Sequence, residues 1–389
     1  MSGKTQSVLS FAAAAIALAL VPINAAAQTT CAATPVASGL ARPIGLVQSN
    51  QGNLLVSESG TSTPNTGRIS IVDVAGHRNT FIDGLPSGIS DVGDPSGPSG
   101  LYLRGRTLYL VIGSGDTVFA GAIPNPNPSS PLFSSVLAIH FSAGVEKKAL
   151  HGFMLTAEDT QAIADGSRVT LTNIDGQQIT IELLVNFPDY TIDATSPSGF
   201  RNVTPFTSLA IGDQLYVSDG GQNKIWRVDL PTATYSVLVA FPRIPNPLPG
   251  PPLIEAVPTG LAYADGQLLV TLFRGFPFPV GSSVVEQVDP VTGVHSPLIT
   301  GLKTAIAVLP LREGAGTDYL VLQHASRPGP PPSPASQPGL VLRFDAQGHP
   351  PTILADCLMR PTAMTLDEKS DMLYVTEYST GRLVVIPMR

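Results

Sequence analysis

Acidic residues stand at matching places in this 389-residue chain, and their chemistry could hold a metal ion. Glu58, Asp219 and Glu377 each end a short apolar run, as in the stretch LYVSD, and Asn223 lies four positions after Asp219. Ca²⁺ prefers carboxylate and amide oxygens, so these four side chains could converge on one calcium ion. The alternative is that they accept backbone N–H groups in turns, as acidic turn residues often do. Their spacing matches neither an EF-hand loop nor a phosphate-binding loop.

Four cationic residues could bind a ligand, and one histidine could act in catalysis. Arg42, Arg201, Lys303 and Arg360 lie near the starts of repeated units, where they could bind an anionic ligand; solvation or pairing with the nearby acids is the alternative. His324 is the candidate general base, because it alone among the histidines follows an apolar run on the side of the long loops. Packing is the alternative role for His324. The chain has no Ser-His-Asp spacing, HExxH or CxxC motif, so nucleophilic and zinc chemistry have no support.

These residues belong to a repeated unit of paired strands. The six copies of the pair are 53–58 with 67–73, 108–111 with 136–139, 215–219 with 224–229, 268–270 with 284–289, 319–322 with 340–345, and 373–377 with 381–386. Most copies begin with a Pro-x-small-apolar strand such as Pro43-Ile44-Gly45-Leu46, and the degenerate starts of the third and fifth copies are placed at Phe206 and Lys303. One outer strand follows each pair. Four-stranded units that recur about every 50 residues are propeller blades, so the sequence predicts an all-β, six-bladed β-propeller.

Two irregularities refine this prediction. The chain ends soon after Pro361, which leaves room for only three strands in the sixth blade, and the stretch 34–40 resembles the outer strand at 352–358. We therefore expect an N-terminal strand to close the ring. The second unit is about twice the usual length, and it contains a capping-box-like start at Thr156 and a hairpin signal at Asp175-Gly176. These signals predict a small helix–hairpin insert in blade two, at about residues 143–200.

The chain resembles the ScyD/ScyE family of exported bacterial proteins, which belongs with the six-bladed NHL-like propellers. The resemblance is carried by the RPIGL segment at 42–46, by LVSESG at 55–60, and by the region 200–229. It covers nearly all of the chain after residue 27 and includes the insert and the ring closure. It implies the propeller fold, and it supplies no catalytic motif to transfer.

The N-terminus predicts export. Lys4, the apolar run 8–21 and the alanines at 25–27 form a signal peptide over residues 1–27, which leaves residues 28–389 as one propeller domain in the periplasm or outside the cell. The net charge of −7 argues against a nucleic-acid partner, and no later segment is long enough for membrane insertion; we expect a monomer. In an oxidising compartment Cys31 and Cys357 invite a disulfide, but the expected topology places them a strand's length apart, so the bond is left open.

Function is expected on one face of the propeller. Long proline-rich loops at 121–131, 242–258, 273–281 and 327–339 share this long-loop face, and loops on a rigid scaffold often carry function. The first hypothesis is a binding protein that recognises a small molecule, glycan or protein there. The alternative is a calcium-dependent hydrolase or lactonase with its site at the mouth of the central channel, by analogy with other six-bladed propellers. Quinone-dependent sugar oxidation lacks a recognisable His-and-Arg set, and the sequence leaves open whether the protein is an enzyme.

Overall fold

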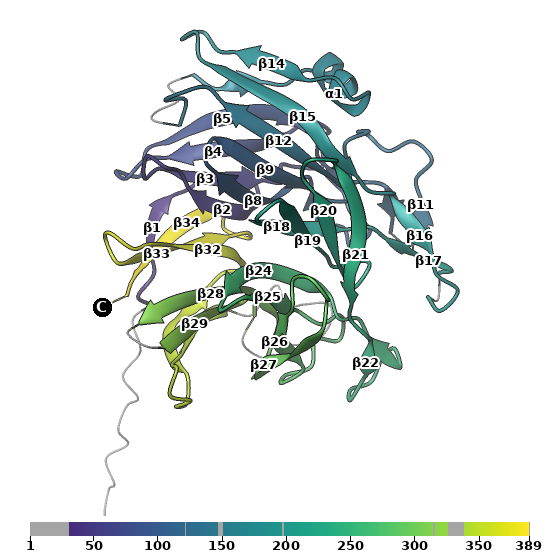
Figure 1. Cartoon of the computed structure of the whole chain (residues 1–389), viewed down its shortest axis with the longest axis vertical. Helices are drawn as coiled ribbons and strands as arrows, with labels where there is room; N and C mark the ends of the chain where they lie inside the picture. The colour runs from purple at the N-terminus through teal and green to yellow at the C-terminus, as the bar shows by residue number, and fades with distance from the viewer. Residues whose placement is uncertain are drawn as a thin grey trace, which may run out of the picture. The chain divides into compact units, whose positions relative to one another are not determined.

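The computed structural model describes residues 31–120, 122–146, 151–196, 198–313, 316–325 and 338–388. The expected signal peptide and most of the loop at 327–339 lie outside these residues. From Cys31 onward the chain forms one compact unit that is almost entirely β-sheet. Six antiparallel sheets of four or five strands follow one another along the chain and are arranged around a common axis (Figure 1). The predicted six-bladed β-propeller is confirmed.

Each blade has the same strand order from the axis outward. Blade one holds β2 (Pro43–Gln48), β3 (Leu54–Glu58), β4 (Gly67–Val72) and β5 (Arg78–Leu85). Blade two holds β8 (Pro98–Arg104), β9 (Thr107–Ile112), β12 (Ser135–Phe141), β15 (Gln178–Asn186) and β14 (Val169–Thr172). Blade three holds β18 (Pro205–Ile211), β19 (Gln214–Asp219), β20 (Lys224–Asp229) and β21 (Thr234–Ala240). Blade four holds β24 (Pro258–Ala264), β25 (Gln267–Leu272), β26 (Ser283–Val288) and β27 (His295–Leu302). Blade five holds β28 (Ala305–Glu313), β29 (Gly316–Gln323), β30 (Gly339–Phe344) and β31 (Thr352–Leu358). Blade six holds β32 (Pro361–Asp367), β33 (Met372–Glu377), β34 (Arg382–Pro387) and β1 (Thr34–Ala37).

The N-terminal strand β1 closes the ring, as predicted. It pairs antiparallel with β34, and Thr34 lies opposite Val385. Cys31 and Cys357 form a disulfide, with their Cα atoms 5.7 Å apart. The expected separation by a strand's length does not arise, because the residues before Thr34 reach the outer strand of blade five.

The insert of blade two extends that blade outward. Thr156 caps α1 (Ala157–Ala164): its side chain accepts the N–H of Asp159, whose carboxylate accepts the N–H of Thr156. β14 and β15 form the predicted hairpin, and β15 is also the fourth strand of the blade. β13 (Phe153–Met154) pairs in parallel with β5 of blade one, so the insert links two blades. α1 and β14 lie together at the outer edge of blade two (Figure 1).

Within the described residues, four further hairpins of very short strands lie between the strands of the blades. No helix in the described part of the chain is long and apolar enough to cross a membrane. The hairpins are β6 (Gly88–Ile89) with β7 (Pro95–Ser96), β10 (Val118–Phe119) with β11 (Ile123–Pro124), β16 (Tyr190–Ile192) with β17 (Phe200–Asn202), and β22 (Ile244–Pro245) with β23 (Leu253–Ile254).

Strand pairing gives all six blades one register at the axis. The first residue of each innermost strand lies opposite the last residue of the second strand, as Pro43 does with Glu58 and Pro361 with Glu377. Blades three and five follow the same rule from Pro205 and Ala305. The predicted start of blade three at Phe206 is therefore one position late, because Pro205 is present but Ser208 stands where other blades have an apolar residue. The predicted start of blade five at Lys303 is two positions early, because Ala305 replaces the proline that marks the other blades.

Candidate functional site

A cavity of about 500 Å³ opens on the long-loop face, where the six innermost strands begin. We call it the mouth cavity. The residue that follows the second strand of each blade lines its wall, and this mouth ring consists of Ser59, Gly113, Gly220, Phe273, His324 and Tyr378. Segments that lead into the innermost strands add Asp91, Asp94, Glu255 and Arg360. All six blades thus contribute to one cavity on the axis, whose wall is mostly apolar and carries a few charged and polar side chains.

His324 is buried in this wall, with 6% of its surface exposed. Its Nδ1 lies 2.9 Å from the carbonyl oxygen of Pro361, so Nδ1 carries the proton and donates it. Arg360 donates from Nε to His324 Nε2 at 3.3 Å. Burial, and next the charge of Arg360, lower the pKa of His324 to about 4. His324 is therefore a neutral imidazole that holds Arg360 in place, and its role as a general base stays a prediction that requires Arg360 to move.

Arg360 and Arg42 meet at one aromatic ring. The guanidinium carbon of Arg360 lies 4.7 Å from the centre of the Tyr378 ring, and that of Arg42 lies 5.2 Å from it. Arg360 also forms an ion pair with Asp94, with 2.9 Å between nitrogen and oxygen. Burial and the neighbouring Asp94 raise the pKa of Tyr378 to about 12, so its hydroxyl stays protonated. Two of the four predicted ligand-binding cations thus lie together with His324.

The backbone at both arginines is strained, and buried acids hold it. Arg42 and Arg360 have φ angles of 58° and 52°, in the left-handed region that side chains rarely adopt. Glu58 and Glu377 each accept the N–H of the residue before one of these arginines. Each acid also forms an ion pair with an arginine of its own blade. The two acids therefore fix the loops that present Arg42 and Arg360 at the mouth.

Asp219 has the same structural role in blade three. Its carboxylate is fully buried and accepts N–H groups from Thr204 at 2.9 Å, Gln222 at 3.0 Å and the Trp226 indole at 2.8 Å. Burial raises the pKa of Asp219 to about 6, and these hydrogen bonds oppose the shift. All three predicted acids thus hold the chain where it enters an innermost strand, which was the alternative to calcium binding.

Asn223, the fourth predicted calcium ligand, is also engaged within the protein. Its side-chain oxygen accepts the N–H of Val257 at 3.0 Å, and its amide nitrogen donates to Glu255. Across the residues that the structure describes, no three His, Cys, Asp or Glu side chains are grouped so that they could hold a metal ion. The geometry therefore gives the calcium prediction no support.

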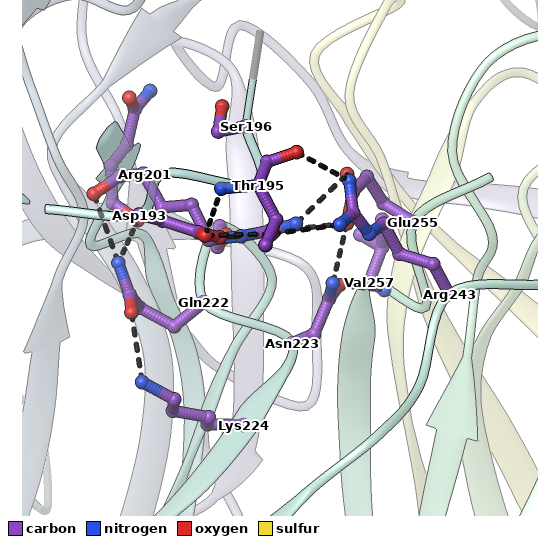
Figure 2. Close-up of polar contacts among 12 residues, drawn as sticks. Asp193, Thr195, Ser196, Arg201, Gln222, Asn223, Lys224, Arg243, Glu255 and Val257 are labelled. Atoms are coloured by element: carbon purple, nitrogen blue, oxygen red, sulfur yellow. Dashed lines mark hydrogen bonds and ion pairs between the residues drawn. The ribbon is translucent and has the colours of Figure 1, made fainter. Parts of the chain in front are cut away.

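Arg201 lies in a second network at the rim of the cavity. Figure 2 shows it flanked by Asp193 and Glu255, with Arg243 also directed at Glu255. Its nitrogens lie 2.6 Å from the Asp193 carboxylate and 2.9 Å from that of Glu255. Hydrogen bonds from Thr195 and Arg201 hold the pKa of Asp193 well below its usual range. Arg201 thus binds two protein acids and positions Glu255 in the cavity wall.

Of the four predicted cations, Arg360 is the one among the described residues that lines the mouth cavity. Lys303, like Arg42 and Arg201, does not line it. It is buried, burial lowers its pKa, and its backbone N–H donates to the side-chain oxygen of Gln323 at 2.6 Å. Gln323 is the blade-five counterpart of the capping acids. Tyr378, Asp94 and Glu255 were not predicted from the sequence. Tyr378 could have been predicted from the repeat, because it directly follows the second strand of blade six, as His324 does in blade five.

Comparison with known proteins supports the fold. No protein-family model and no curated protein matches the sequence. A PQQ-bound aldose sugar dehydrogenase from Streptomyces coelicolor is 16% identical with a TM-score of 0.50, over 90% of this chain and 96% of that chain. A putative oxidoreductase (glucose dehydrogenase) from Thermus thermophilus is 16% identical with a TM-score of 0.51, over 91% and 98%. A gluconolactonase from Xanthomonas campestris is 11% identical with a TM-score of 0.49, over 91% and 89%. At these identities the likeness shows the propeller fold alone.

Proposed function

We propose that the protein binds a small, neutral molecule with several hydroxyl or carbonyl groups, such as a sugar or a sugar lactone, in the mouth cavity. The observation that carries this proposal is the pairing of charges in the wall. Asp94 pairs with Arg360 and Glu255 pairs with Arg201, while Asp91 accepts a hydrogen bond from Asn202 at 2.7 Å.

This pairing favours a neutral ligand. An anionic ligand would lose its hydration and would have to separate Arg360 or Arg201 from its acid, which is costly in a partly buried cavity. Hydroxyl and carbonyl groups can instead add hydrogen bonds to the paired charges, and such charge-assisted bonds are strong. The aromatic rings of Phe273 and Tyr378 supply apolar surface for the carbon skeleton of the ligand.

Thermal unfolding tests the proposal. The chain from residue 28 onward would be melted with neutral monosaccharides, their lactones and the matching sugar acids. A ligand at 100 times its Kd stabilises by about 2.7 kcal/mol, which is a shift of about 4 °C in a chain of this size. We expect neutral members to stabilise the protein and sugar acids to do so less. Arg360→Gln should remove the effect, and Arg312→Gln, at an exposed side chain outside the mouth cavity, should keep it. A larger shift with the sugar acids would refute the proposal.

Catalysis on the same class of molecule is the second candidate function. The observation in its favour is the neutral imidazole of His324 in the cavity wall, whose Nε2 would be available as a base if a ligand drew Arg360 away. The two sugar dehydrogenases show that this scaffold carries enzymes that act on sugars. Hydrolysis of the lactones, followed by acid release, would be expected in the wild type and lost in His324→Gln. If the lactones bind but are not hydrolysed, binding is the only one of the two functions that remains supported.

We also propose that the protein is exported and that it belongs to the ScyD/ScyE family. The Cys31–Cys357 disulfide supports an oxidising compartment, as expected for a protein with a signal peptide at residues 1–27 in the ScyD/ScyE family. N-terminal sequencing of the protein recovered from the periplasm or the medium checks this. A start near Gln28 is expected, and a chain that keeps its first residues inside the cell would contradict it.

A further inference from the structure

A second ring of residues closes the floor of the mouth cavity. The second residue of every innermost strand lines the cavity at the same register, and this neck ring consists of Ile44, Ser99, Phe206, Thr259, Ile306 and Thr362. The ring combines three apolar side chains with three that carry a hydroxyl group.

The hydroxyl groups of the neck ring are used between the blades. Ser99 donates to the carbonyl oxygen of Phe206 at 2.7 Å, and Thr362 donates to that of Pro43 at 3.0 Å. Thr259 likewise contacts the carbonyl oxygen of Ala305 at 3.3 Å. Because these hydroxyls bond to the neighbouring strand, the ring presents mainly hydrocarbon to the axis.

A second cavity of about 350 Å³ lies beyond the neck ring, enclosed by the same six innermost strands. We call it the lower channel. Ile44, Phe206, Ile306 and Thr362 line both cavities, so the two are adjacent along the axis. Deeper positions are mostly aliphatic, and none of the described residues that line the lower channel carries a charge. Hydroxyl-bearing residues such as Thr207, Ser208 and Tyr263 also line the lower channel, but none of them is charged, so an alkyl group can lie against the aliphatic part without leaving an ion unhydrated.

We propose that the ligand of the mouth cavity carries one alkyl chain, which passes the neck ring and lies in the lower channel. This inference rests on the proposed function, because the mouth cavity must hold the polar head. At ~30 Å³ for a water-sized group, the lower channel has space for roughly a dozen methylene groups, which is enough for one chain of the length of an octyl group. Ile44 and Phe206 are half-buried, so their side chains can change rotamer to admit the chain.

Titration calorimetry with the chain from residue 28 onward tests this inference. The probes are methyl, butyl, hexyl and octyl β-D-glucopyranoside, each below its micelle concentration. If the chain enters the lower channel, affinity should rise about four-fold for each added methylene, which corresponds to about 0.8 kcal/mol. Ile44→Trp should flatten this dependence, with each affinity compared with that of the same variant for methyl glucoside. Phe206→Trp is a second blocking variant, in case the first does not fold. Ile353→Trp, at an exposed outer-strand position, is the matched control and should keep the wild-type dependence.

The outcomes separate this inference from the proposed function. Equal affinity for all chain lengths, with methyl glucoside bound, would overturn the inference and leave the mouth cavity as a binding site. The same chain-length dependence in wild type and both neck variants would also overturn it, because the chain would then lie elsewhere. If no member of the series binds, the inference fails together with the sugar-like head that it requires.

Discussion

His324 should make the protein less stable in mild acid. Burial lowers the pKa of its imidazole to about 4, whereas an unfolded histidine has a pKa of 6.5. The unfolded chain therefore binds a proton more readily, so the contribution of neutral His324 is fully present above pH 6.5 and is lost as the pH falls through 4. A difference of about 2.5 pKa units corresponds to about 3 kcal/mol of unfolding free energy. The structural reason is that a protonated ring at this place faces the Arg360 guanidinium at 3.3 Å.

The assay must isolate His324 from an opposing group. Asp219, whose pKa burial raises to about 6, gives stability that is present below pH 3.8 and is lost as the pH rises through 6. We would therefore measure urea unfolding of wild type and His324→Gln from pH 4 to pH 7.5 and compare their difference at each pH. Gln can still donate to Pro361 and accept from Arg360. The wild type should lose about 3 kcal/mol relative to the variant between pH 7 and pH 4, while His151→Gln, at a half-exposed histidine, controls for the loss of one imidazole. Parallel curves for wild type and His324→Gln would refute the reasoning.

Three further predictions follow from the same contacts. Glu377→Gln should cost about 2–4 kcal/mol in urea unfolding, because the buried carboxylate of Glu377 pairs with an arginine and caps a backbone N–H; Glu158→Gln, exposed on α1, should change stability by less than about 0.5 kcal/mol, and equal effects would contradict this. Replacing both cysteines with alanine should cost about 2–5 kcal/mol, and the unreduced, unfolded wild type should show no reactive thiol; two thiols would rule the bridge out. Melting temperatures in Ca²⁺ and in EDTA should coincide, because the oxygens of the predicted ligands already accept protein donors; a shift that Asp219→Asn abolishes would restore the calcium site.

The repeat made the fold predictable. Local strand and turn preferences are visible in the sequence. The number of sheets could therefore be predicted from the apolar pairs of strands and the prolines at the starts of blades, and the ring closure from the shortened last blade. The error in blade five shows the limit of this signal. Ala305 takes the place of the proline that marks other blades, so the start of the strand was visible only from its pairing with Gln323.

The candidate site was only partly predictable, because residue type does not show which partner a side chain takes. Arg42, Arg360 and His324 were identified from their place in the repeat; Arg360 and His324 do meet at the mouth, and Arg42 shares the Tyr378 ring with Arg360. Glu58 and Asp219 were visible as acids, but their backbone donors include residues 15 or more positions away in the chain. The sequence left calcium binding and capping open for this reason.

The register of the strand pairs, more than the types of the residues, determines which positions line the axis of this propeller. In four blades the last residue of the second strand caps the chain that enters the innermost strand, as Gln323 and Asp219 do. The next residue along, such as Tyr378, faces the mouth, and the second residue of the innermost strand faces the neck. The capping side chains already accept hydrogen bonds from backbone N–H groups, so substitutions there should mainly change the free energy of unfolding. Ligand preference should instead follow the mouth and neck rings, where the side chains differ between blades while their positions are fixed by strand pairing.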